Sequence, residues 1–216
     1  MPQAGSIFRY SQLPVDYWRG HILNAARIEI RRLTSADAAA YRDIRLAGLR
    51  DSPEAFGSTF VRENAQPLAW FWDRLRNSQV FGAFRSTDLS GIAGFVIREG
   101  EKERHKGLLW GMYVRPDARK AGVGRQLVEA VIDHARSQVE VIQLSVVSDN
   151  EPARRLYACL GFVEYGVEKN SLKQNGRYYD EVLMALDLRV DSDQQVPPAR
   201  RANAALCEEL TASSAE

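Results

Sequence analysis

The segment whose residue types best suit chemistry is a basic, glycine-spaced loop at residues 115–125. An apolar run at 108–114 leads into this loop, and a long amphipathic pattern starts where the loop ends. Gly122 and Gly124 can adopt positive φ and carry no Cβ that would block a ligand. Consecutive backbone N–H groups and a helix N-terminus can then bind an anion such as a phosphate. Three basic side chains of the loop supply countercharge, namely Arg119, Lys120 and Arg125.

The loop differs from two common nucleotide-binding motifs. It lacks the Gly-Lys-Ser/Thr of a P-loop, and it has one Gly-x-Gly pair instead of the three spaced glycines of a dinucleotide-binding turn. Taken alone, the same residues could also form only a tight turn between a strand and a helix. The loop therefore indicates a phosphate-containing ligand without identifying it.

A second pattern with chemical potential lies at residues 150–162. Asn150 suits a helix N-cap, Pro152 suits the first turn, and Gly161 suits the end of the same helix. Tyr157 falls on the apolar face of this helix. Taken alone, it could be a core tyrosine whose hydroxyl bonds to a backbone partner.

The elements that position these two patterns alternate between strands and helices. Residue periodicity predicts strands at 28–33, 80–85, 91–98, 108–114, 141–147, 163–167 and 179–188. It predicts helices with an apolar face over 38–49 and over 67–77, 123–139 and 150–160. The order β-α-α-β-β-β-α-β-α-β-β indicates a mixed sheet with helices on both faces.

Both ends of the chain differ from this alternating middle. Residues 1–27 show no sustained period and are interpreted as an N-terminal extension. Residues 190–216 begin with a polar run and two prolines, which predicts a polar, partly mobile C-terminal tail. We therefore expect one domain at 28–189.

Composition excludes several classes of protein. The chain has 216 residues, of which 45% are hydrophobic and 26% charged, as in soluble globular proteins. The net charge of +1 gives no indication of a nucleic-acid partner. The chain has no apolar run of about 18 residues and no signal-peptide pattern, so we expect no membrane partner and a cytoplasmic location. Three histidines and two cysteines without ligand spacing predict no metal site.

Two motifs, at the separation they have here, resemble the GNAT superfamily of acetyl-CoA-dependent N-acetyltransferases. The first is R-x-x-G-x-G at 119–124, and the second is N-x-x-A-R-x-x-Y-x-x-x-G-F at 150–162. The resemblance covers about residues 28–188. It implies an α/β fold with a central mixed, largely antiparallel sheet that splays between its fourth and fifth strands, flanked by about four α-helices.

The resemblance also implies acetyl-CoA as co-substrate. The pyrophosphate would lie on the 122–125 segment, and the pantetheine arm would pair with the splayed strand as though it were an extra strand. Gly111 could form the bulge that starts the splay. The residues implied to bind the cofactor are Met112, Tyr113, Val114, Arg119, Lys120, Ala121, Gly122, Val123, Gly124, Arg125, Asn150 and Tyr157.

Two of these residues have implied chemical roles. The N–H of Val114 or a near neighbour would stabilise the oxyanion, and Tyr157 would protonate the departing thiolate as general acid. Asn150 would contact the pantetheine arm, although it could also be only a helix cap.

The general base is left open by the sequence. Some relatives place a carboxylate on the strand before the phosphate loop, but residues 107–114 contain none. The candidates are a chain of water molecules or one of five side chains: Glu63, Glu103, His105, Asp180 and Glu181. Each of the five could equally be a solvated surface group.

The acceptor is also left open. The resemblance places it near residues 52–63 and 175–181, where Glu63, Asp180 and Glu181 could bind a cationic amine or simply favour solubility. The predicted function is transfer of an acetyl group to a primary amine of a small molecule or peptide by direct attack. The alternative is a non-catalytic module that senses CoA or acyl-CoA, and a homodimer is left open in either case.

Overall fold

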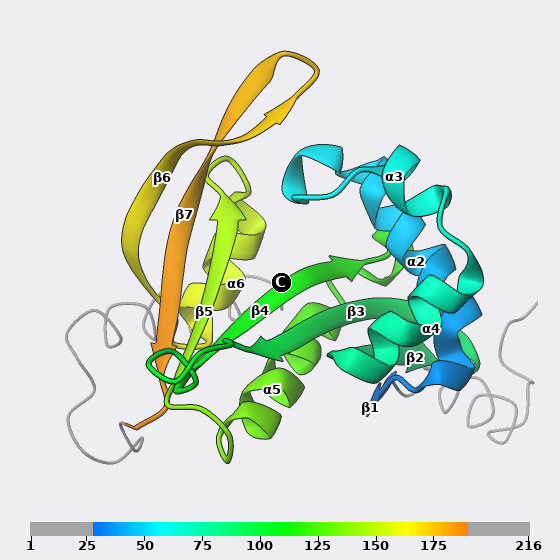
Figure 1. Ribbon diagram of the computed structural model, residues 1–216, viewed down its shortest axis with the longest axis horizontal. Helices are drawn as coiled ribbons and strands as arrows, with labels where there is room; N and C mark the ends of the chain where they lie inside the picture. The colour runs from blue at the N-terminus through cyan, green and yellow to red at the C-terminus, as the bar shows by residue number, and fades with distance from the viewer. Residues whose placement is uncertain (1–27, 190–216) are drawn as a thin grey trace, which may run out of the picture.

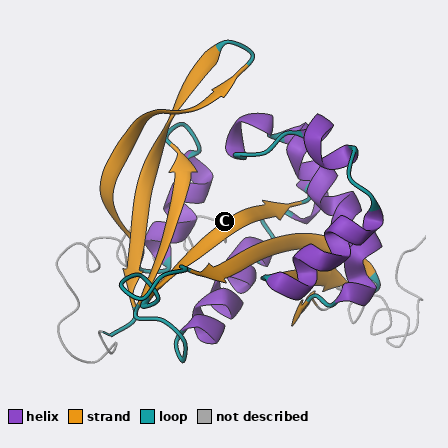
Figure 2. Cartoon of the chain, in the orientation of Figure 1, coloured by secondary structure: helices purple, strands orange, loops and turns teal. Residues whose placement is uncertain are grey.

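The computed structural model describes residues 28–189, which form one twisted sheet with helices on both faces (Figures 1 and 2). The predicted extension at 1–27 and the predicted tail at 190–216 lie outside the described residues. None of the helices within the described part is long and apolar enough to span a membrane.

The sheet has seven strands in the order β1-β2-β3-β4-β5-β7-β6. Their bounds are β1 Ile28–Arg32, β2 Gln79–Arg85, β3 Asp88–Ile97, β4 Lys106–Val114, β5 Val141–Val147, β6 Val163–Gln174 and β7 Arg177–Asp187. All neighbouring strands are antiparallel except β4 and β5, which are parallel. The prediction of a mixed, largely antiparallel sheet is therefore confirmed.

Five α-helices and three short 3-10 turns join these strands. The helices are α2 Ala38–Asp51, α3 Phe60–Asn64, α4 Leu68–Asn77, α5 Val123–Ala135 and α6 Glu151–Cys159. The 3-10 turns are η1 Ser35–Asp37, η2 Pro53–Ala55 and η3 Pro116–Ala118.

Two hydrophobic clusters hold the helices to opposite faces of the sheet. One cluster packs α5 against the strands, and the other packs α2 and α4. Val80 and Phe81 are neighbours on β2 but belong to different clusters. Because successive side chains of a strand point to opposite faces, the two clusters lie on opposite sides of the sheet.

The sheet splays between its fourth and fifth strands, as predicted. β4 pairs with β5 only at residues 106–108, after which the two strands separate (Figure 1). Gly111 has a φ of 63°. The register with β3 passes from Gly94 opposite Trp110 to Ile92 opposite Tyr113, so one residue of β3 faces two of β4. This bulge at the start of the splay confirms the expectation for Gly111.

One observed helix was not predicted, and one predicted helix ends early. The sequence predicts about four helices and misses α3, because five residues are too few to show a helical period. Thr59 caps α3 by accepting a hydrogen bond from the Arg62 N–H at 3.3 Å. The predicted helix at 123–139 ends earlier, at Ala135, whose carbonyl accepts from the N–H groups of both Gln138 and Val139.

Candidate functional site

The loop between β4 and α5 has the backbone that its glycine spacing predicts. Gly122 is the N-cap of α5 and has a φ of 75° and a ψ of 0°. A Cβ placed on it would meet no atom nearer than Gln126 Nε2, at 3.8 Å. Lys120 also lies in the left-handed region, with a φ of 62°. The loop therefore leaves open space in front of the first turn of α5.

The N–H groups in the first turn of α5 have no side-chain cap. Such groups also lack partners within their own helix, so they are available to an anion. The N-terminus of α6 differs, because Asn150 Oδ1 accepts from the Ala153 N–H at 3.3 Å. The start of α5 is therefore suited to a phosphate group, and the start of α6 is already capped.

The basic side chains of the loop are exposed but partly engaged. Arg119 donates from Nε to the Val114 carbonyl oxygen at 3.0 Å, which fixes the loop to the end of β4. Arg125 Nε lies 2.9 Å from Glu129 Oε1 in an exposed ion pair. Ala121 is exposed, whereas the Val123 side chain is in the core and can offer a ligand only its backbone.

Gly124 is needed for close packing, whereas Gly122 is needed for its backbone conformation. A Cβ on this residue would lie 3.1 Å from Met112 Cε and 3.3 Å from Leu156 Cδ2. Its lack of a side chain thus allows the start of α5 to approach both the bulge of β4 and α6. The two glycines of the loop therefore contribute in different ways.

Tyr157 lies on α6 facing the splayed part of β4. Its hydroxyl donates to Met112 Sδ at 3.3 Å, and its ring packs edge-on against Phe162 at 5.7 Å between centroids. The side chain is 6% exposed, and burial raises the pKa of the phenol above its ordinary value. The helix ends as predicted, with the Phe162 N–H donating to the Tyr157 carbonyl at 3.0 Å and Gly161 at a φ of 89°.

The side chain of Tyr113 lies on the other face of the sheet, in the cluster with α2 and α4. Its hydroxyl donates to Asp51 Oδ2 in a short hydrogen bond. Burial, together with the hydrogen bond to Asp51, raises the pKa of Tyr113 to about 12. Of the predicted cofactor-binding residues on β4, Tyr113 can thus offer only its backbone to the face of α5 and α6.

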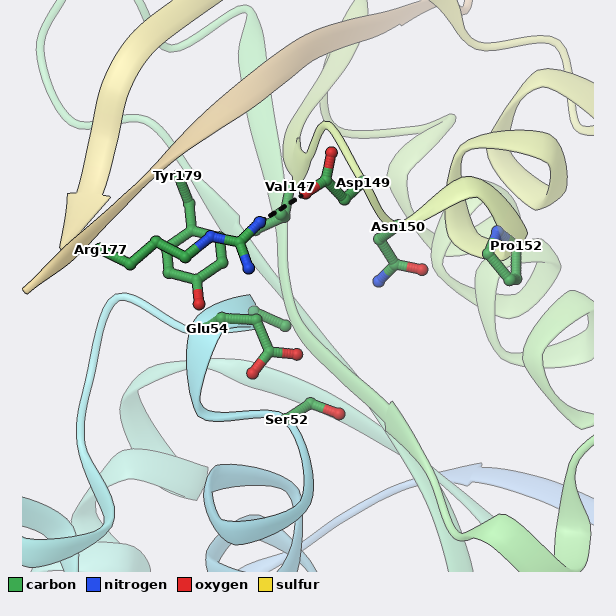
Figure 3. Close-up of a pocket in the computed structure, with 9 residues that line it drawn as sticks. Ser52, Glu54, Val147, Asp149, Asn150, Pro152, Arg177 and Tyr179 are labelled. Carbon is green, nitrogen blue, oxygen red and sulfur yellow. Dashed lines mark hydrogen bonds and ion pairs between the residues drawn. The ribbon is translucent and has the colours of Figure 1, made fainter. Parts of the chain in front are cut away.

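A cavity of about 390 Å³ lies between the end of β5, the start of α6, the α2–η2 connection and the start of β7. It is lined by Ser52, Glu54, Ala55, Val147, Asp149, Asn150, Pro152, Arg177 and Tyr179 (Figure 3). Five of these residues fall within the two regions that the family resemblance indicates for an acceptor, 52–63 and 175–181, and the other four come from the β5–α6 segment. Asn150 therefore caps α6 and also lines the cavity.

The three acids predicted to meet a substrate are not among the residues that line this cavity. Glu63 is 1% exposed and forms an ion pair with Arg45, with Oε1 2.8 Å from Nη2. Asp180 accepts from Lys169 Nζ at 2.7 Å. Glu181 accepts from the hydroxyl groups of Ser145 and Ser171 at 2.8 and 2.6 Å.

The buried ion pair explains the electrostatics of Glu63. Burial alone would raise the pKa of Glu63. The hydrogen bonds and the positive charge of Arg45, with smaller contributions from Ser58 and Arg74, together outweigh burial, so the pKa is lowered. The expectation of a surface group or substrate ligand is therefore wrong for Glu63, because α3 packs it against α2.

The other two candidate bases lie far from the loop. Glu103 and His105 precede β4, whereas the phosphate loop follows it. Within residues 28–189 there is also no group of three or more His, Cys, Asp or Glu side chains that could hold a metal ion.

Sequence reasoning missed both carboxylates that line the cavity, Glu54 and Asp149. For Glu54 the reason is local. Its only signal was its place in a loop rich in Gly, Pro and Ser, which says nothing of where the side chain points. Arg177 and Asp149 were missed because their contact depends on the position of β7 beside β5, which the local sequence does not show.

Comparison with known proteins adds to this geometry. The model of the acetyltransferase (GNAT) family matches residues 44–162. An L-methionine sulfoximine/L-methionine sulfone acetyltransferase of Pseudomonas aeruginosa is 30% identical over 163 residues, covering 67% of this chain and 94% of the relative. A ribosomal protein bS18-alanine N-acetyltransferase of Escherichia coli is 30% identical over 141 residues, covering 64% and 92%.

Solved structures agree with these relatives. An acetyltransferase of Salmonella typhimurium, solved with its cofactor acetyl-CoA, is 26% identical and superposes with a TM-score of 0.64. The match covers 80% of this chain and 98% of that one.

Proposed function

This chain belongs to the acetyltransferase (GNAT) family, and from that premise we propose that it transfers an acetyl group from acetyl-CoA to a primary amine of a small molecule or protein by direct attack. GNAT enzymes use acetyl-CoA. The observation that carries the proposal is that β4 separates from β5 and then leads into a glycine loop and the uncapped N-terminus of α5.

The residues present fit acetyl-CoA on three counts. The space in front of Gly122 is open, the first-turn amides of α5 are uncapped, and β4 has no β5 partner after residue 108. The loop 119–125 would hold the pyrophosphate, with Lys120 and Arg125 beside it. The backbone of 112–114 would hold the pantetheine arm, with Asn150 near its end.

The Val114 N–H is the amide best placed to bind the thioester oxygen. The Arg115 N–H donates to the Ser90 carbonyl on the β3 side at 2.9 Å. Because N–H groups alternate along a strand, the N–H of Val114 points to the other side, where β5 has separated. Acetyl-CoA supplies an acetyl group activated as a thioester, and this amide would stabilise negative charge on its oxygen.

Tyr157 would supply the proton that the departing thiol needs. Its hydroxyl points at Met112 on the splayed strand, and burial keeps the phenol protonated. A phenol held in its neutral form can donate a proton to a sulfur anion that develops beside it. Tyr157 therefore acts as general acid in this proposal.

In this proposal the amine acceptor binds in the cavity lined by Glu54 and Arg177. The two relatives named above act, by their names, on methionine derivatives and on the alanine of a ribosomal protein. Both are amines, which supports an amine acceptor here. A cytoplasmic location, a homodimer and the lack of nucleic-acid or membrane partners stay predictions.

The test is release of free thiol from acetyl-CoA in the presence of a panel of amines, with CoA binding measured by calorimetry. We expect release that depends on the amine and is unchanged in Arg104→Gln, an exposed residue outside the splay. Binding of CoA without thiol release for any amine would instead support the CoA-sensing module.

A further inference from the structure

The cavity on the acceptor side is lined by three charged side chains, of which Asp149 is already paired with Arg177. Glu54 comes from η2, and Arg177 comes from the first residue of β7. Figure 3 shows the guanidinium of Arg177 above the carboxylate of Glu54, with Asn150 and Pro152 at the start of α6 to the right. A small number of polar or charged groups around a pocket fixes the orientation of a ligand and gives specificity.

Of Glu54 and Arg177, Glu54 is the one whose charged group has no partner among the described residues. It is half-buried, and none of the residues 28–189 forms a hydrogen bond or ion pair with its carboxylate. The other acids proposed for the acceptor already have partners, as described above. A carboxylate that faces a cavity without a partner is suited to an ammonium group.

Arg177 is held in position but keeps free donors. Its Nη2 donates to Asp149 Oδ2 at 3.2 Å, and its guanidinium lies 4.8 Å from the centre of the Tyr179 ring. Within the described residues its Nε and Nη1 have no acceptor. Because a guanidinium has five N–H donors, the remaining ones can bind a carboxylate.

From these two side chains we infer that the acceptor is a small zwitterion of the free amino acid type. Its ammonium lies at Glu54 and its carboxylate at Arg177. This inference rests on the proposed function and adds the substrate class. A cavity of about 390 Å³ suits a small molecule. A protein N-terminus offers the ammonium without an adjacent carboxylate and would leave the donors of Arg177 unpaired.

The experiment compares acceptors that differ only in the carboxylate. Thiol release is measured with the standard L-amino acids, with their C-terminal amides and with short peptides that begin with the same residues. We expect the acids to exceed the amides by about 10- to 100-fold in kcat/KM, the range for one hydrogen bond to a charged group. The amine of an amide is the more readily deprotonated, so intrinsic reactivity would favour the opposite order.

Two variants separate the two contacts. Arg177→Gln should abolish the preference for acids over amides and act mainly through KM. Glu54→Gln should lower kcat/KM for acids and amides alike and keep the preference. Arg104→Gln and Glu101→Gln are matched controls on the exposed β3–β4 connection and should change neither. CoA affinity should be the same in all of them.

Each outcome decides the inference. Amides or peptides that match the acids, or a preference for acids that survives in Arg177→Gln, would overturn it and leave the proposed function standing. Absence of thiol release with every amine, despite CoA binding, would remove the proposed function and the inference together.

Discussion

Tyr157 is the residue on which the proposed chemistry depends most. Its hydroxyl donates a hydrogen bond from α6 to the bulged part of β4, at the Met112 sulfur. Its burial distinguishes it from the exposed tyrosines of β6 and β7, such as Tyr165 and Tyr178. Burial disfavours the charged form, so the hydroxyl stays a donor well into the alkaline range.

Tyr157→Phe should keep acetyl-CoA binding and lower turnover, because the ring and its packing remain while the proton is lost. We expect a loss of about 10²-fold or less, the low end for general acid catalysis, since a thiolate leaves fairly readily without help. The measurement is steady-state turnover with a saturating amine, alongside CoA binding by calorimetry.

The pH dependence sharpens this test. An unperturbed phenol would give the parent an alkaline limb that the variant lacks. Because burial raises the pKa of Tyr157, the ratio of parent to variant activity should instead be constant between about pH 7 and 10, the ordinary phenol pKa. Tyr165→Phe is the exposed control, and equal losses of binding and turnover in Tyr157→Phe would assign Tyr157 to cofactor positioning.

At the scale of elements, the start of α5 depends on a backbone that only glycine adopts without strain. Gly122→Ala should destabilise the fold by about 1–2 kcal/mol, the penalty for a side chain in the left-handed region. It should weaken CoA binding by a further factor of about ten, because the new Cβ enters the space that the anion needs.

Gly124→Ala is the matched comparison, since its Cβ would meet Met112 and Leu156 at 3.1 and 3.3 Å. It should lower the melting temperature through packing, at an ordinary negative φ. Calorimetry of CoA binding together with thermal unfolding separates the two effects. CoA binding by Gly122→Ala equal to that of the parent would reduce the loop to a simple turn.

The turn between β1 and α2 gives a prediction for acid stability. Asp37 accepts from Arg31 at 2.7 and 2.9 Å and from the Thr34 N–H at 2.8 Å. The Arg31 guanidinium holds the pKa of Asp37 at about 2. Because this pKa is below the ordinary value, the stabilisation is present above about pH 4 and is lost as pH falls through about 2.

Asp37→Asn should therefore lower the free energy of unfolding by about 1–2 kcal/mol at pH 7, as expected for loss of a charged cap. The difference from the parent should decrease as pH falls from about 4 to about 2 and should vanish only below pH 2. Urea unfolding across this pH range measures it, with the exposed Asp73→Asn as control. A difference as large below pH 2 as at pH 7 would show that packing, rather than the charge, is responsible.

At the scale of the whole molecule, the proposed cofactor site is formed by several elements, namely β4, the loop after it, α5 and α6. β4 and β5 share only three paired residues, and the pantetheine arm would lie where they separate. A ligand that binds only the folded state stabilises it by mass action. At 100 times its dissociation constant, CoA should add about 2.7 kcal/mol to the free energy of unfolding.

Thermal unfolding with CoA, acetyl-CoA and ATP tests this expectation. We expect CoA and acetyl-CoA to raise the melting temperature and ATP at the same concentration to have a smaller effect, because ATP lacks the pantetheine arm. A rise with ATP alone would indicate another class of ligand for the loop.

The sequence by itself determined the order of the strands and of most of the helices along the chain. It also determined the glycine loop and the capped helix that carries Tyr157. These features are local. The φ of Gly122, the Asn150 cap and the end of α6 at Gly161 depend on residues within a few positions of each other. The bulge at Gly111 was expected from the family resemblance, and it agrees with the tendency of glycine in a strand to mark a bulge.

Only the tertiary structure decided which charged side chains meet. Glu63 and Glu54 are nine residues apart in the same polar region, yet one is buried against Arg45 and the other faces the cavity. Arg45 and Glu63 are 18 residues apart, and Arg177 and Asp149 are 28 apart. Such pairs depend on how α3 packs on α2 and how β7 lies beside β5, which no local pattern of residues specifies.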